Sequence, residues 1–226
     1  MLTSLTSTVG TRLAGRAKGL LTAFAATSAA HLGSLLTDTR VVEQATKPAL
    51  MPLLAAHALG GSGPVPKLLA RALLASTAGD VLLQVPAEPA FLAGMGAFAA
   101  AHVSYIAMFA QQGALTDRRR TVLVGCAYAA TWVVMLGLLW PGLGALQVPV
   151  AGYSLLLAGT AVTAAGLGLR AGLGGGLFLL SDTLIATRLA GWRQLPGHEF
   201  WIMSTYIAAQ YLLATAALRA EAAPAD

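Results

Sequence analysis

The sequence is poor in charged residues. Only 10% of its 226 residues are Asp, Glu, Lys or Arg, whereas 57% are hydrophobic. A typical soluble domain carries about 25% charged residues, so this chain lacks the polar side chains that a water-facing globule needs. Its apolar content also excludes an intrinsically disordered chain. The composition therefore indicates a protein that lies within a membrane.

Cysteine and metal-binding motifs are also scarce. Cys126 is the single cysteine, which excludes an intrachain disulfide and any cysteine-based zinc site. The histidines show neither an i, i+4 pair nor an HExxH motif; they are His31, His57, His102 and His198. The chain has no Walker loop for phosphate and no GxSxG motif. We therefore predict neither a metal ion nor a cofactor.

What the chain does have is eight apolar blocks. Their lengths approach the roughly 20 residues that a helix needs to cross a bilayer, and we find no ten-residue alternating strands of a barrel. We predict an all-α, polytopic integral membrane protein of about eight transmembrane helices, at residues 20–36, 47–59, 68–85, 91–109, 121–139, 148–167, 173–189 and 201–218. One transmembrane domain then covers residues 20–218, between a cytoplasmic N-terminal segment at 1–19 and a short cytoplasmic tail at 219–226.

The first two blocks each raise a local question. Basic residues before block 20–36 and small residues within it also fit a signal peptide. We favour a retained helix, because an even number of spans agrees with the charges of the loops. The second block opens with Thr46, Lys47 and Pro48, which predicts an N-cap followed by proline in the first turn. Pro52 predicts a kink one turn later.

The basic residues predict the orientation. With eight spans, ten of the 14 Lys and Arg residues fall on the side of both termini and four fall on the other side. Both termini are therefore predicted to be cytoplasmic, in a multi-pass protein of the inner or plasma membrane. Trp140, Trp192 and Trp201 lie at span ends on the opposite face, where indole rings prefer the interface. The net charge of +5 is thus explained by loops that face lipid headgroups, and no nucleic-acid partner is expected.

Two aspartates lie inside the predicted spans, Asp80 in the third block and Asp182 in the seventh. A carboxylate in the hydrocarbon core costs about 2.5–3.5 kcal/mol, so such a residue indicates a functional site. Both lie nearer the non-cytoplasmic end of their helices, at similar predicted depth, so they can share one site. The alternative is that each only bridges helices by a hydrogen bond.

The two aspartates also suggest an internal duplication. They are 102 residues apart, and each is followed by an apolar helix with polar residues: His102 and Tyr105 after the first, Tyr206 and Gln210 after the second. Four helices per unit would give two parallel repeats. Chance similarity between helices rich in Leu and Ala is the alternative.

Further polar residues surround the predicted site. Thr77, Asp80 and Gln84 share one helix face, as do Phe98, His102, Tyr105 and Phe109. Lys47 can neutralise Asp80 or hold a phosphate, unless it only snorkels to the interface. We take Asp80 and Asp182 as the candidate catalytic residues. The candidate substrate-binding residues are Lys47, His102, Tyr105, Tyr206 and Gln210.

Several short motifs resemble the YhhN-type membrane family, which includes the mammalian lysoplasmalogenases. The resemblance covers about 47–218 and is carried by motifs that start at Thr46 (TKPALMP), Gly79 (GDVLL), Leu177 (LFLLSDTL) and Thr205 (TY, then Gln210), together with Phe98, His102 and Tyr105. The resemblance implies hydrolysis of the vinyl-ether bond of a lysoplasmalogen. The products are a fatty aldehyde and glycerophosphoethanolamine or glycerophosphocholine.

The implied chemistry suits two carboxyl groups. A vinyl ether hydrolyses after protonation of its β-carbon, and water then attacks the resulting oxocarbenium ion. One protonated carboxylic acid can supply the proton, while an ionised carboxylate stabilises the cation and orients water, as in glycoside hydrolysis. Asp80 and Asp182 fit these roles, without an assignment of either role to either residue.

Two other functions remain open at this point. An intramembrane aspartyl protease also uses two membrane aspartates, but it normally carries Gly-x-Gly-Asp and Tyr-Asp. This chain instead has Thr77-Ala78-Gly79-Asp80 and Ser181-Asp182. A proton-coupled lipid or solute carrier would use the aspartates as proton relays. The predicted partners are a lysophospholipid substrate and the lipid bilayer, and the sequence predicts no oligomeric state.

Overall fold

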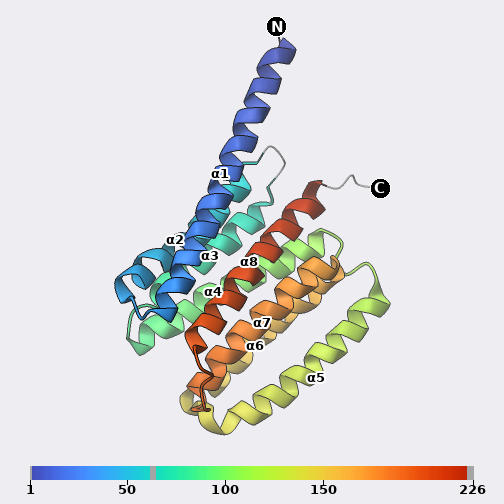
Figure 1. Cartoon of the computed structure of the whole chain (residues 1–226). Helices are drawn as coiled ribbons and strands as arrows, with labels where there is room; N and C mark the ends of the chain where they lie inside the picture. Colours follow the sequence, from blue (N-terminus) through green and yellow to red (C-terminus); the bar gives the residue numbers. More distant parts are fainter. Residues whose placement is uncertain (1, 62–64, 223–226) are drawn as a thin grey trace.

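A computed structural model describes residues 2–61 and 65–222, and every regular element in these two ranges is a helix (Figure 1). The prediction of an all-α protein is therefore confirmed. The described ranges contain eight α-helices and one 3₁₀ turn, Gly144–Leu146. The α-helices are α1 Leu2–Leu36, α2 Arg40–Leu59, α3 Lys67–Leu82, α4 Glu88–Gln111, α5 Arg118–Leu143, α6 Gln147–Gly166, α7 Leu169–Leu189 and α8 His198–Ala222.

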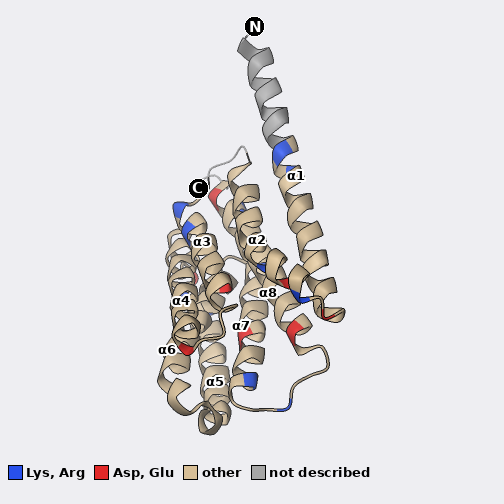
Figure 2. Cartoon of the chain, turned by 90° about the vertical axis from the view of Figure 1, so that its left-hand side faces the viewer, with Lys and Arg blue, Asp and Glu red and all other residues tan. Residues whose placement is uncertain are grey.

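Five segments of the described chain are long and apolar enough to cross a membrane: Gly15–Leu36, Glu88–Gln111, Arg118–Gly166, Leu169–Leu189 and His198–Ala222. The longest of them contains both α5 and α6. The protein is thus a multi-pass membrane protein. The helix α3 is only 16 residues long, and α2 carries charged residues in its first two turns, so the count of eight spans stays a prediction. Figure 2 shows how few charged residues interrupt the helices.

Several predicted boundaries differ from the structure. The helix α2 begins at Arg40, so Thr46 is not its N-cap and Pro48 lies inside the helix. The N-cap position belongs to Thr39, and the hydroxyl of Thr46 instead donates to the carbonyl of Val42, 2.6 Å away. The helix α3 ends at Leu82 rather than at residue 85. Pro86 disfavours helical backbone at Val85, the residue before it. The helix α1 continues through the segment 1–19 from residue 2 onward, and α8 extends into the tail to residue 222.

The helices pack as neighbours along the chain, with contacts between the two halves in the middle of the bundle. Within the first half α1 contacts α2, α2 contacts α3 and α3 contacts α4; within the second half α5, α6, α7 and α8 repeat this order. Contacts of α4 with α6 and of α2 with α8 join the halves. This arrangement is the one that a duplicated four-helix unit would have, although the duplication itself stays a prediction.

The two outer helices differ in how they pack. Figure 1 shows α1 and α5 at opposite edges of the bundle. The helix α1 contacts α8 as well as α2, whereas α5 packs mainly on α6 and buries only Leu139 and Leu143. At the centre, small residues allow close approach: a Cβ on Gly175 of α7 would lie 2.7 Å from the Cα of Ala161 in α6. The bundle is therefore tight around α4, α6, α7 and α8 and looser beside α5.

Candidate active site

A cavity lies between α5 and the centre of the bundle. It encloses about 1140 Å³ of space not filled by atoms, counted out to its open side. Its lining comes from every helix between α2 and α8. Four of the seven candidate residues line it: Lys47, Asp80, Asp182 and Tyr206. The rest of the lining is mostly apolar and includes Met95, Phe98, Met135, Leu136, Leu139 and Ile185.

The Asp80 carboxylate lies at the end of a hydrogen-bond network made by α3, α4 and α8. Asp80 is 2% exposed and accepts a hydrogen bond of 2.8 Å from the hydroxyl of Tyr206. The amide nitrogen of Gln210 donates to the same hydroxyl (3.3 Å) and to Ser76 (2.9 Å). The hydroxyl of Tyr105 donates to the amide oxygen of Gln210 at 2.6 Å. We call these five residues the Asp80 network.

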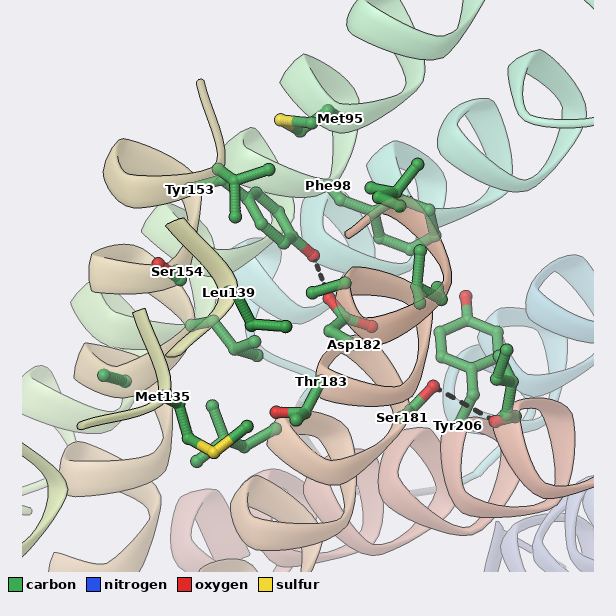
Figure 3. A pocket seen from close by; sticks show the side chains of 18 of the residues that line it. Met95, Phe98, Met135, Leu139, Tyr153, Ser154, Ser181, Asp182, Thr183 and Tyr206 are labelled. Atoms are coloured by element: carbon green, nitrogen blue, oxygen red, sulfur yellow. Dashed lines mark hydrogen bonds between the residues drawn. The ribbon is translucent and has the colours of Figure 1, made fainter. Parts of the chain in front are cut away.

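The Asp182 carboxylate ends a second network, made by α4, α6 and α7. The hydroxyl of Tyr153 donates to Asp182, and Figure 3 shows these two side chains meeting in the cavity. The Tyr153 hydroxyl lies 3.2 Å from Nε2 of His102. The other ring nitrogen of His102, Nδ1, lies 3.1 Å from the hydroxyl of Thr160. We call these four residues the Asp182 network.

An aromatic cluster packs against both networks. The ring of Phe178, which is buried, lies 4.7 Å from the ring of His102 and 5.5 Å from that of Tyr206, measured between centroids. Phe98 packs edge-on against Phe178 and Tyr206. Within the described chain, no hydrogen bond joins the two networks. Two aspartates therefore face one cavity, each with its own tyrosine.

Lys47 is a cation in the wall of the cavity. The sequence predicted Lys47 at the start of the second helix, but it lies seven residues after Arg40, where α2 begins. Its side chain is half-buried. The only ion pair between described side chains joins Arg188 of α7 to Glu199 of α8, so no carboxylate lies within ion-pair distance of Lys47. An ammonium group that lines a largely apolar cavity, with no described carboxylate within ion-pair distance, is suited to an anionic ligand.

Three candidate residues lie behind the cavity wall and not in it. His102, Tyr105 and Gln210 are fully buried and absent from the lining. His102 supports Tyr153, while Tyr105 and Gln210 support Tyr206. The three residues therefore position the tyrosines and do not reach a ligand in the cavity.

The predicted polar face of the third helix does not form. The hydroxyl of Thr77 donates to the carbonyl of Leu73, and the amide of Gln84 lies 3.5 Å from the backbone oxygen of Asp80. Neither Thr77 nor Gln84 lines the cavity. The helix ends at Leu82, so Gln84 no longer follows the helical spacing that would place it beside Asp80.

Sequence reasoning missed three residues of the two networks: Ser76, Tyr153 and Thr160. Tyr153 is the most important of them, because its hydroxyl contacts Asp182. Its signal was a phenol within a largely apolar block, because a buried phenol needs a hydrogen-bond partner. Ser76 and Thr160 carried no such signal, since small hydroxyl residues are common in membrane helices and often donate to their own backbone.

The described residues contain no group of three or more His, Cys, Asp or Glu side chains that could hold a metal ion. The polar groups of the residues that line the cavity are instead carboxyls, phenols, small hydroxyls, one indole N–H and one ammonium group. This set can donate and accept protons and can bind an anion. Its chemistry is that of an acid–base site in an apolar surrounding.

Comparison with known proteins shows the family of the chain. The model of the YhhN family matches residues 42–217. The chain is 36% identical over 169 residues to human lysoplasmalogenase TMEM86B, covering 73% of this chain and 70% of that protein. It is 34% identical over 139 residues to the lysoplasmalogenase of Mycobacterium tuberculosis, covering 58% of this chain and 52% of that protein. No solved structure matches the chain significantly.

Proposed function

Because the chain belongs to the YhhN family, we propose that it is a lysoplasmalogenase, a membrane enzyme that hydrolyses the vinyl-ether bond of lysoplasmalogens. The observation that carries the proposal is the meeting of Asp80 and Asp182 in one largely apolar cavity. The relatives with about 35% identity are named for this activity.

The reaction needs two acid–base groups. One aspartic acid transfers its proton to the β-carbon of the vinyl ether, whose π electrons form the new C–H bond. The ether oxygen stabilises the resulting cation as an oxocarbenium ion. Water then adds to the α-carbon and gives up a proton to the other, ionised aspartate. The hemiacetal formed in this way breaks its bond to the glycerol oxygen, so the products are a fatty aldehyde and a glycerophospho headgroup.

The cavity also suits the two ends of the substrate. Apolar side chains of α4, α5 and α7 provide a compartment for the alkenyl chain. Lys47 lines the same cavity, and none of the described carboxylates lies within ion-pair distance of it, so its ammonium group can bind the phosphate. The helix α5 is poorly buried, so the compartment lies next to the lipid phase from which a lysolipid comes.

The test is mass spectrometry of lipids incubated with the purified protein. A 1-alkenyl lysophosphatidylethanolamine should yield fatty aldehyde and glycerophosphoethanolamine, and the 1-acyl lipid of equal chain length should stay intact. The Asp80→Asn variant, expected to be slower by about 100-fold or more, serves as the control. Cleavage of a transmembrane peptide would indicate an aspartyl protease, and lipid movement across a vesicle without any product would indicate a carrier.

A further inference from the structure

The two aspartates differ in the hydrogen bonds that surround them, and this difference assigns their roles. We infer that Asp182 donates the proton to the vinyl ether and that Asp80 is the carboxylate that accepts a proton from water. This inference rests on the proposed function. Tyr153 and His102 are then positioning residues for the acid, and Tyr206 and Gln210 are positioning residues for the base. Neither sequence pattern nor family resemblance makes this distinction.

The Asp80 network can carry its hydrogen bonds in only one direction. Tyr105 is fully buried, and Gln210 is the one described hydrogen-bond partner of its hydroxyl, so this hydroxyl must donate to the amide oxygen. The amide nitrogen then faces Ser76 and Tyr206. An amide nitrogen only donates, so the Tyr206 oxygen accepts this bond and its single proton points to Asp80. Asp80 is therefore the acceptor in this bond, and the Asp80 network contains no acceptor for a proton on its carboxyl group, so the network favours the ionised carboxylate.

The Asp182 network can run in either direction. A neutral imidazole has one donor and one acceptor nitrogen, and the tautomer decides which is which. With Nε2 of His102 as donor, Tyr153 gives its proton to Asp182; with Nε2 as acceptor, Tyr153 gives its proton to His102 and receives one from a protonated Asp182. The hydroxyl of Thr160 can donate to or accept from Nδ1, so it fits both tautomers.

This reversibility is what a proton donor needs. In the protonated resting state Asp182 donates its single proton to the oxygen of Tyr153, and rotation of the carboxyl group turns that proton toward the substrate in the cavity. After the proton has moved to carbon, Tyr153 turns its hydroxyl toward the new carboxylate, and His102 changes tautomer. No hydrogen-bonding group is left unpaired in either state. The Asp80 network offers no such exchange, because Gln210 has no second protonation state.

Charged neighbours support the same division. The charges that act on Asp80 come from Lys47 of α2, and its polar partner is Tyr206 of α8. The groups that act on Asp182 are Tyr153 of α6 and the carboxylate of Asp80. On α5 the titratable residue in the lining is Tyr128. Lys47 thus acts on the residue assigned as ionised from beyond ion-pair distance, and the charged group that acts on the residue assigned as acid is the other aspartate.

The cycle balances without any further reactant. Asp182 loses a proton to carbon, and Asp80 gains one from the attacking water. When the hemiacetal breaks down, Asp80 returns its proton to the departing glycerol oxygen, and Asp182 takes the proton of the hemiacetal hydroxyl. Both aspartates then have their starting protonation states, and one water has been consumed for each aldehyde released.

The test is the pH dependence of kcat/KM for aldehyde release in the full-length protein and its variants. The wild type should show a bell, but two coupled carboxyls titrate as a pair, so the bell alone assigns neither limb. Asp182→Asn should lose the fall at alkaline pH, because no acid remains to be deprotonated, and Asp80→Asn should lose the fall at acidic pH. Both variants should be slower by about 100-fold or more.

Two matched hydroxyl deletions extend the test without removing a carboxyl. Tyr153→Phe keeps the ring that packs on His102, and Tyr206→Phe keeps the ring that packs on Phe178. Each should lower kcat by about tenfold with KM nearly unchanged, since a hydrogen bond to a charged group is lost. Tyr153→Phe should displace only the alkaline limb and Tyr206→Phe only the acidic limb. Size-exclusion profiles identical to wild type would show that each variant is folded.

The possible results separate cleanly. The role assignment would be overturned if Asp182→Asn lost the acidic limb of the pH profile and Asp80→Asn lost the alkaline limb. It would also be overturned if each tyrosine variant displaced both limbs. Either result would leave the lysoplasmalogenase proposal in place. A folded wild type that releases no aldehyde from any 1-alkenyl lysolipid would instead refute the proposed function, and the role assignment with it.

Discussion

Lys47 offers a prediction whose size follows from its surroundings. Its ammonium group lines the cavity, and no described carboxylate lies within ion-pair distance. If it binds the substrate phosphate, Lys47→Gln removes one charge-assisted hydrogen bond, worth about 1.5–3 kcal/mol. That free energy corresponds to a loss of about 10- to 150-fold in kcat/KM. The loss should appear mainly as a raised KM, because the phosphate lies away from the reacting carbons.

The assay compares two substrates that differ only in the phosphate. The variant should be impaired on a 1-alkenyl lysophosphatidylethanolamine and nearly normal on the matching 1-alkenylglycerol, which has no phosphate for Lys47 to bind. Lys67→Gln is the matched control, because Lys67 is exposed at the start of α3 and does not line the cavity. Equal losses on both lipids would refute phosphate binding and would mean that Lys47 acts through its charge on Asp80.

Three other predictions concern the whole site. Asp80→Asn and Asp182→Asn should each fold and insert but lose at least about 100-fold in turnover; near-normal hydrolysis by either variant would make that residue structural. Activity should survive exhaustive chelation, and a loss reversed by zinc would show a metal that the described side chains do not predict. In a Cys126→Ala background, a cysteine at Ala87 should react with an impermeant thiol reagent in intact cells, and one at Leu115 only after lysis; the opposite pattern would invert the topology.

The helices could be predicted well because the membrane imposes a simple rule on their composition. Apolar blocks interrupted by charged or proline-containing loops gave the order of all eight described α-helices. The start of α2 was wrong because Thr46 followed by Pro48 is a strong local N-cap signal, whereas the structure begins this helix two turns earlier, at Arg40. A proline inside a membrane helix is tolerated when its surroundings satisfy the freed carbonyl, so it does not mark a helix end there.

The members of the site were easier to predict than their places in it. A charged or polar residue in an apolar block stands out, which is why Asp80 and Asp182 could be found. A helix that is apolar all round, however, has no polar stripe to show which face turns inward. His102 and Tyr105 are one turn apart, yet the first contacts α6 and the second contacts α8. The distinction between residues in the wall and residues behind it therefore needed the structure.

The arrangement of the two networks makes the site a product of the whole bundle. Asp80 belongs to the first four helices, but its hydroxyl partner Tyr206 belongs to the last four. Asp182 and Tyr153 both belong to the second half, but His102, which sets the proton position of Tyr153, belongs to the first. Neither half contains a complete aspartate network. If the halves descend from a duplication, paired aspartates with different roles could arise only after the two units had packed together, because each role depends on side chains of the other half.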